Sequence, residues 1–365
     1  MRNKTPARRE TNKKRRGAVI VLVALLTVPL LGLVALAVDY GHLCVVRTDL
    51  QRSADAAALA AVRDLVPAAD GTQDLDKVRA AVRQYATANV RNVSGFTVLD
   101  SDIEIGRYDP ATIYTNFTIQ NNGIFDTVRV TLRRDTTANS PVSVFFARIF
   151  GIDNANVTAT ATAVLQKASV LYPGSDILPF AVHEDLWNSQ GMGSTWSIYG
   201  NGQILDNLGG SIPGNWGTID IGAENNSTSE LRDQILNGLR QKDLDALYND
   251  QRIPSNESID SNDPWFAQSD TGLSLGLKSA VQTVHGQTKL VPIYSSVWGN
   301  GNNTEFHVTG WGVVEVVDSG WNGNNNTYVT LRKAYTYDGT LRAPVDLSNT
   351  TGVITGAYTT PVLVQ

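Results

Sequence analysis

The side chains that most often carry out chemistry are sparse and irregularly spaced in this chain. The histidines and the single cysteine are His42, His183, His285, His307 and Cys44. No histidine has a partner at the spacing that a metal site requires. The most polar surroundings are at His183-Glu184-Asp185, a segment that we interpret as a solvated loop. The sequence therefore predicts no catalytic site, no metal site and no cofactor, and we expect a protein that is not an enzyme.

A stripe of small residues is the best candidate for a contact surface. Ala54, Ala57, Ala58 and Ala61 recur three or four residues apart, which places them on one face of a helix. Small side chains at this spacing let another backbone approach closely. Two interpretations fit: an amphipathic helix that covers the sheet of its own domain, or a helix that packs against similar helices in an assembly. Our hypothesis for these four residues is the second, a helix-packing interface.

An apolar run precedes the stripe and predicts where the protein is located. Gly17–Val38 contains 22 residues without a charge, and as a helix it would span about 33 Å against a hydrocarbon core of about 30 Å. The first 16 residues carry eight basic side chains and one acid, so the positive-inside rule keeps them cytoplasmic. We expect a single-pass protein of the inner (cytoplasmic) membrane with residues 39–365 periplasmic or extracytoplasmic. The alternative is a cleaved signal peptide, because Ala35-Leu36-Ala37 fits a cleavage site.

The charge balance excludes one class of partner. The net charge is −5 and the basic tail contributes +7, so the other 349 residues carry about −12. An acidic exported part argues against nucleic acid as a partner. One cysteine cannot form an internal disulfide. The low content of charged residues, 18%, fits an exported, β-rich body.

The pattern along the chain predicts an α+β protein in five segments. These are a basic cytoplasmic tail (1–16), a transmembrane helix (17–38), a membrane-proximal alanine-rich helix (39–66), a small α+β domain (70–166) and a mostly antiparallel β-rich domain (173–365). Within 70–166, hydrophobic periodicity predicts a helix at 74–90, strands at 102–108, 126–134 and 157–165, and a short apolar helix at 141–150.

The second domain is rich in tryptophan, glycine and asparagine. Its one clear helix begins at a capping box formed by Ser227 and Glu230. Alternating runs at 290–298, 305–317 and 327–337, separated by Asn-Gly turns, predict an antiparallel meander. The tryptophans of this region either are buried or line a sugar-binding surface. The four that we considered for such a surface are Trp265, Trp298, Trp311 and Trp321.

Residues 16–62 resemble the N-terminal segment of TadE/TadG-like proteins, which help to assemble Flp (tight adherence) pili. The shared pattern is Arg-Gly before the apolar run, then Asp39-x-Gly41, Arg47, Leu50-Gln51 and the run Ala54–Ala61. Pro141–Gly151 with Val157–Ala163 is similar to the end of the TadG-like domain. Further blocks similar to TadG-related proteins are Gly214–Gly222, Asn225–Thr228, Asp270–Ser274 and Gly286–Tyr294.

The sequence differs from the family pattern at two points. Pilins and pilin-like TadE proteins carry Glu five residues after the prepilin cleavage Gly, whereas Leu22 stands at that distance from Gly17. Asp346-Leu-Ser348-Asn-Thr350 resembles a von Willebrand A metal-binding loop, but only 15 residues follow it, too few for that domain.

The resemblance implies a non-enzymatic membrane component of Flp/Tad pilus assembly and secretion that contacts other pilus-assembly or pilin-like membrane proteins. The N-terminal helix would then be a site of homo- or hetero-oligomer contact. The alternative is a membrane-anchored extracytoplasmic module that binds a ligand such as a glycan, or that acts as a sensor.

Overall fold

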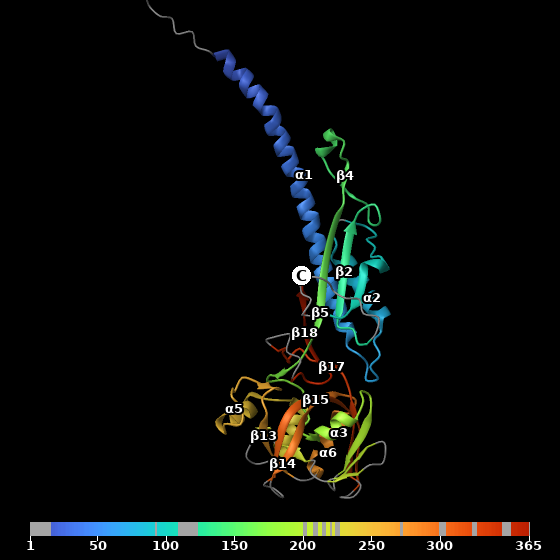
Figure 1. The fold of residues 1–365 in the computed structure, drawn as a ribbon, viewed down its shortest axis with the longest axis vertical. Helices are drawn as coiled ribbons and strands as arrows, with labels where there is room; N and C mark the ends of the chain where they lie inside the picture. Colours follow the sequence, from blue (N-terminus) through green and yellow to red (C-terminus); the bar gives the residue numbers. More distant parts are fainter. Residues whose placement is uncertain are drawn as a thin grey trace, which may run out of the picture.

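The computed structural model shows a long helix that leads into an elongated body with two large sheets (Figure 1). It describes residues 16–91, 93–108, 123–199, 203–206, 211–213, 217–219, 221–222, 227–270, 273–298, 304–322, 327–344 and 352–364. The small α+β unit lies beside the second half of the helix, and the β-rich unit lies at the end of the body farthest from residue 16. The expected α+β architecture is confirmed.

The N-terminal helix α1 is continuous through the apolar run and the alanine stripe. It covers Arg16–Val62, contains Pro29, and passes into a short 3-10 helix, η1 (Arg63–Leu65). The apolar half has almost no protein cover, and Val19–Leu31 are exposed. From Leu50 onward one face is buried. By length and composition this helix could cross a membrane.

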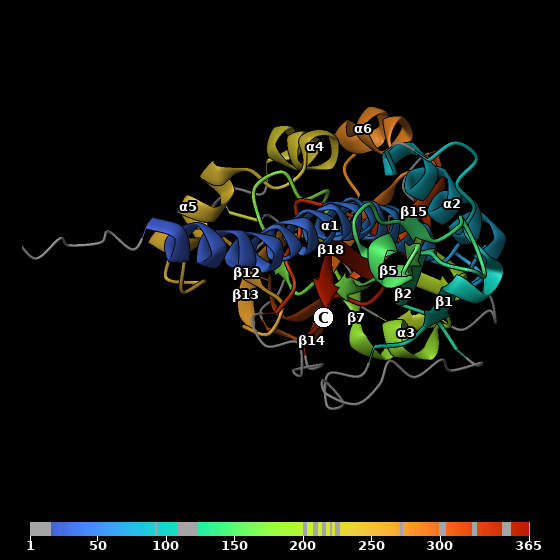
Figure 2. The same ribbon diagram turned by 90° about the horizontal axis from the view of Figure 1, so that it is seen from above.

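The α+β unit is built on a five-stranded sheet with two helices on one face. The strand order is β1-β2-β5-β18-β17, with bounds Ile103–Gly106, Thr127–Arg134, Val157–Lys167, Ala357–Val364 and Thr336–Tyr337. Helix α2 (Leu75–Asn89) begins at Asp74, whose carboxylate accepts the Lys77 N–H at 2.9 Å. Side chains of α1 and α2 share one hydrophobic core with β1, β2 and β5. In the view along the long axis of the molecule, α1 passes in front of the body (Figure 2).

The last strand of this sheet comes from the far end of the sequence. Strand β18 lies within the segment expected to belong to the second domain, yet it pairs antiparallel with β5, for example Leu363 with Ala163. Tyr358 of β18 is 5% exposed and belongs to the same core as the alanines of α1. The C-terminal strand therefore completes the N-terminal sheet.

The helix expected at 141–150 is wrong for most of its length. Val142–Ser143 form a short strand, β3, that pairs with β4 (Asn154–Ala155), and only Ala147–Phe150 coil, as the 3-10 helix η4. Proline at the start and glycine at the end suggested one helix, and Gly151 does end η4 with φ +80°. The residues between β3 and η4 are held instead by a contact with α1 that is described below.

The β-rich unit is built on a nine-stranded sheet, and its described residues also form four helices. Its bounds are β7 Val182–His183, β8 Thr195–Tyr199, β9 Gln203–Asp206, β10 Ser211–Pro213, β11 Thr218–Ile219, β13 Trp265–Asp270, β14 Thr288–Trp298, β15 Thr304–Trp321 and β16 Thr327–Lys333. Strands β6 (Val170–Leu171) and β12 (Ile259–Asp260) form a separate pair. Strands β14, β15 and β16 pair antiparallel in chain order, as the meander predicted.

The helices of this unit are α3 (Glu184–Ser189), α4 (Thr228–Asn237), α5 (Gln241–Asn249) and α6 (Lys278–Thr283), with the 3-10 helix η5 (Leu275–Leu277) before α6. The predicted start of α4 is confirmed, because the Ser227 side chain accepts the Glu230 N–H at 3.3 Å. The capping pattern is the one clear sign of a helix in the sequence of the second domain, and α5 and α6 were not predicted.

Helix α3 is fixed to the sheet by one close contact and one buried cation. A Cβ at Gly312 of β15 would lie within 2.2 Å of the Trp187 ring, so only glycine leaves room for that indole. Lys333 lies 4.3 Å from the centroid of the same ring and donates to the carbonyl oxygens of Trp187 and Gln190. Burial lowers the pKa of Lys333. These residues hold the core of the β-rich unit together.

Candidate functional site

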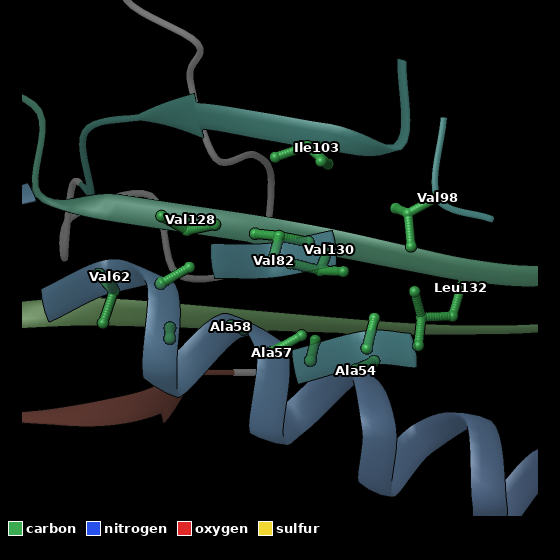
Figure 3. Close-up of a cluster of buried hydrophobic side chains, with 14 of the residues drawn as sticks. Ala54, Ala57, Ala58, Val62, Val82, Val98, Ile103, Val128, Val130 and Leu132 are labelled. Carbon is green, nitrogen blue, oxygen red and sulfur yellow. The ribbon is translucent and has the colours of Figure 1, made fainter. Parts of the chain in front are cut away.

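The alanine stripe lies inside the domain of its own chain. Ala54, Ala57, Ala58 and Ala61 are each 0% exposed. Figure 3 shows the first three on the side of α1 that faces the strands, close to Val130 and Leu132 of β2. Because an alanine side chain is a single methyl group, the backbone of α1 can pack close to the sheet. The stripe is thus the face by which the helix joins the α+β unit.

The structure shows one of the two roles that the sequence left open for the stripe. A second helix could reach these four alanines only by displacing strands of the chain's own sheet, so a helix-packing interface at these positions remains a prediction that requires the domain to open. The other faces of α1 at this level are half-buried, with Asp55, Ala56, Leu59 and Ala60 partly exposed. The exposed polar residues Arg47, Thr48 and Arg52 lie before the stripe.

The junction between the apolar and alanine-rich halves of α1 is built around Asp39. Its carboxylate is 4% exposed and accepts the backbone N–H groups of Phe145, Phe146 and Ala147 at 2.8, 2.9 and 2.7 Å. These are free donors at the start of η4, and an ionised carboxylate is a strong acceptor for them. One side chain of α1 thus fixes the segment Val142–Ala155, which we call the junction hairpin.

The charge of Asp39 is maintained by the groups around it. Burial alone would raise its pKa, but the three N–H donors and nearby His42 outweigh that effect, and the pKa lies below the usual value of 3.8. His42 also contacts the Phe145 ring edge-on, with 5.4 Å between the ring centroids. Asp39 is therefore ionised at neutral pH, as its role of acceptor for three donors requires.

Replacing Asp39 with asparagine is expected to release the junction hairpin. An amide group has one acceptor oxygen and brings an NH₂ donor against backbone donors, so the three hydrogen bonds cannot all be kept. Hydrogen–deuterium exchange should become faster at Phe145, Phe146 and Ala147 and stay unchanged in α2. Unchanged exchange at the three hairpin amides would contradict the role of Asp39.

The same contact should depend on pH in one direction. Because the pKa of Asp39 is lower in the folded chain than in the unfolded chain, its contribution to stability is fully present above about pH 4. The contribution is lost as the pH falls through the lowered pKa of the folded state. The protection of the three hairpin amides, expressed relative to the intrinsic exchange rate at each pH, should therefore fall only in acid, whereas a fall in protection between pH 5 and 8 would contradict the assignment to Asp39.

The tryptophans considered for a sugar-binding surface are mostly in the core. Trp265, Trp311 and Trp321 are 3%, 2% and 8% exposed, so they cannot line such a surface in this fold. Trp298 is 53% exposed and lies beside Phe266 and His307, with ring centroids 5.1 and 6.0 Å away. The sequence pattern of strands and glycine-rich turns does not indicate whether a given indole lies on the buried or the exposed face of the sheet. Of the four tryptophans considered for a sugar-binding surface, Trp298 alone is exposed, in a cluster with Phe266 and His307.

The histidines occupy separate structural positions. His183 caps α3 by accepting the Asp185 N–H at 3.1 Å, so the predicted solvated loop is the start of a helix. His285 and His307 lie within hydrogen-bonding distance of Ser319 and Ser295, at 2.9 and 3.1 Å. Among the residues that the structure describes, no group of three His, Cys, Asp or Glu side chains is placed to hold a metal ion.

A cavity of about 440 Å³ lies at the end of the first sheet nearest the β-rich unit. Its lining includes Arg107, Asp126, Lys167, Tyr335 and Tyr358. The Asp126 carboxylate accepts the Tyr108 N–H at 2.8 Å and the Thr127 hydroxyl at 2.7 Å, while burial raises its pKa. These groups could hold a small polar molecule, but the described lining contains no histidine, cysteine or serine.

The fold defines a class of protein in which one long N-terminal helix leads from an apolar segment into a small α+β domain. Within this class, residues 17–64 match the family model described as putative Flp pilus-assembly TadE/G-like, and residues 49–163 match the one described as putative Tad-like Flp pilus-assembly. These two matches support the resemblance of residues 17–163 to TadE/G-like Flp pilus-assembly proteins. No curated protein and no solved structure matches it.

The two matches overlap at residues 49–64, at the end of α1 and in η1, and the second match ends inside β5. They include the blocks at 16–62 and 141–163 on which the resemblance rests, with Asp39 among the matched residues. The blocks that begin at Gly214 lie beyond the last matched residue, and 214–216, 220, 225–226 and 271–272 are outside the described residues. The loop at 346–350 and the tail at 1–15 are also outside them.

Proposed function

We propose that this protein is a non-enzymatic, single-pass component of the inner membrane that takes part in Flp/Tad pilus assembly and secretion. The observation that carries the proposal is the pair of family matches that overlap in α1, one over the helix and one over the α+β unit. The N-terminal tail lies in the cytoplasm, and residues 39–365 lie on the other side of the membrane.

The charge and exposure of α1 support this orientation. The tail is strongly basic, which favours the cytoplasmic side. The large apolar side chains from Val19 to Val38 are about half exposed or more, for example Ile20 at 71% and Val28 at 72%. Such a surface is unfavourable in water and suits hydrocarbon. Leu22 stands where prepilins have Glu. This difference supports a protein that keeps its N-terminus and assists pilus assembly from the membrane.

Partner proteins would contact the surfaces that the fold leaves exposed. The alanine stripe is used within the domain, so pilin-like membrane helices would meet the apolar half of α1, where all side chains of Val19–Leu31 are exposed. The exported units would contact other assembly proteins through their polar surfaces. Homo- or hetero-oligomers would form through the apolar half.

Co-purification tests the proposed contacts. A tagged chain is extracted from membranes in mild detergent, beside a matched variant whose residues 17–38 are replaced by an unrelated apolar helix of equal length. We expect Flp/Tad assembly proteins to be enriched with the native chain and reduced with the replaced helix. Recovery of the same proteins with an unrelated tagged membrane protein, or of no Flp/Tad protein, would contradict the proposal.

A further inference from the structure

The junction hairpin carries a dense group of exposed apolar side chains. Five lie within eight residues: Phe145 at 62%, Phe146 at 42%, Ile149 at 81%, Phe150 at 68% and Ile152 at 54% exposure. Outside α1, the other large exposed apolar residues that the structure describes are spread over distant elements, apart from the pair Phe266 and Trp298. Single exposed apolar residues are ordinary, but a group of them marks a surface that meets a membrane or another protein.

The position of this group along α1 is fixed by Asp39. Asp39 directly follows the 22-residue apolar run, and a helical run of that length matches the hydrocarbon thickness of about 30 Å. Asp39 therefore stands at the membrane boundary if α1 spans the bilayer. The N–H groups of Phe145 and Ala147 lie within 2.8 Å of its carboxylate oxygens. The hairpin is thus held at the same level as the boundary.

The hairpin also extends from Asp39 toward the apolar half of the helix. Figure 1 shows it as the green projection that runs beside α1 on the side nearer residue 16. Ala35, one turn before Asp39 on the same face, is half-buried, whereas Leu36 and Val38 are exposed. Arg148 is exposed among the apolar side chains. Aromatic rings with a nearby cation are typical of groups at the lipid headgroup region.

We propose that the junction hairpin inserts its tip, Phe145–Ile152, into the outer-face interface of the membrane that α1 spans. This rests on the membrane anchoring in the proposed function and adds a second, lipid-facing contact to it. The occupant of the apolar surface is the bilayer, because Asp39 places the tip beside the end of the apolar run. With two points in the membrane, the α+β unit is held in one orientation on the membrane surface.

The depth of a fluorescent label tests the insertion. Cys44 is the only cysteine, so single-cysteine variants are made in a Cys44→Ser chain and labelled with a polarity-sensitive dye. Ile149→Cys is the test position, and its high exposure keeps the change out of the core. Leu26→Cys, within the apolar run, and Leu275→Cys, 61% exposed in the β-rich unit, are the matched controls. Each full-length variant is reconstituted in phosphatidylcholine–phosphatidylglycerol vesicles that contain lipids with quenchers at shallow or deep positions.

We expect shallow quenchers to reduce the emission of the Ile149 label at least about twofold more than that of the Leu275 label, since an interfacial tip lies near the headgroups. Deep quenchers should act most on Leu26. Quenching at Leu26 with none at Ile149 would overturn the hairpin proposal and leave the anchor intact. A blue-shifted but unquenched Ile149 label would indicate a protein contact and would also overturn it. Absence of quenching at both positions would overturn the anchor and the hairpin together. No pilus protein is present, so none of these outcomes depends on pilus assembly.

Discussion

Replacing Ala57 with leucine is expected to destabilise the α+β unit by about 1–3 kcal/mol, the usual cost of extra methylene groups in a packed core. Ala57 is 0% exposed and belongs to the core that α1 forms with β2 and β5. A leucine would push the helix away from the sheet. All seven tryptophans follow residue 186, so their fluorescence would report mainly on the β-rich unit. Hydrogen–deuterium exchange of Thr127–Arg134 and Val157–Lys167 is the suitable measurement.

Ala56→Leu is the matched control for this prediction. Ala56 is on the neighbouring, half-buried face of the same turn, so we expect exchange in β2 and β5 to change little. If Ala57→Leu left the strands protected but abolished complex formation, the alanine stripe would face a partner helix, as the helix-packing hypothesis for these residues states. Faster exchange in both strands would place the stripe within the domain.

A chain that ends at Gly356 is expected to lose much of the stability of the α+β unit. This truncation removes β18, which pairs with β5, and with it the buried Tyr358. Loss of one large buried aromatic side chain alone typically costs about 3–5 kcal/mol. The hydrogen-bonding edge of β5 would also become free. Amides of β5 between Thr162 and Lys167 should exchange much faster in the truncated chain.

Leu363→Ala is the control that distinguishes the loss of β18 from a general sensitivity of the C-terminal residues to change. Leu363 is 41% exposed, so its truncation to alanine should leave the protection of β5 nearly unchanged. A chain ending at Gly356 that kept full protection in β5 would show that β18 is dispensable for the sheet. A loss confined to the β-rich unit would likewise contradict the pairing.

Local patterns predicted the elements that their own residues determine. The 3.6-residue period located α2, the alternation of Val128, Val130 and Leu132 located β2, and the Ser227 cap located α4. Contacts between distant residues could not be read in this way. Asp39 and Phe145 are 106 residues apart, and nothing near either one indicates the other. The same limit applies to β18, whose partner strand ends at Lys167.

For the alanine stripe, the sequence predicted a shared helix face, and its use as a helix-packing interface stays a prediction. The spacing of Ala54, Ala57, Ala58 and Ala61 correctly indicated one buried face, but spacing does not say whether a sheet or another helix covers it. Asp39 could be noticed only as part of the family pattern, because a single acid after an apolar run usually marks the end of a membrane span. Its role as an acceptor for three backbone donors became visible only with the fold.

The most direct test of the assembly role is the number of pili on cells that lack this gene. Electron microscopy would count Flp-type pili in the wild type, in the deletion strain and in the deletion strain complemented with the full chain. We predict that pili are absent or strongly reduced in the deletion strain and return on complementation. Normal piliation and surface attachment without the gene would contradict the account.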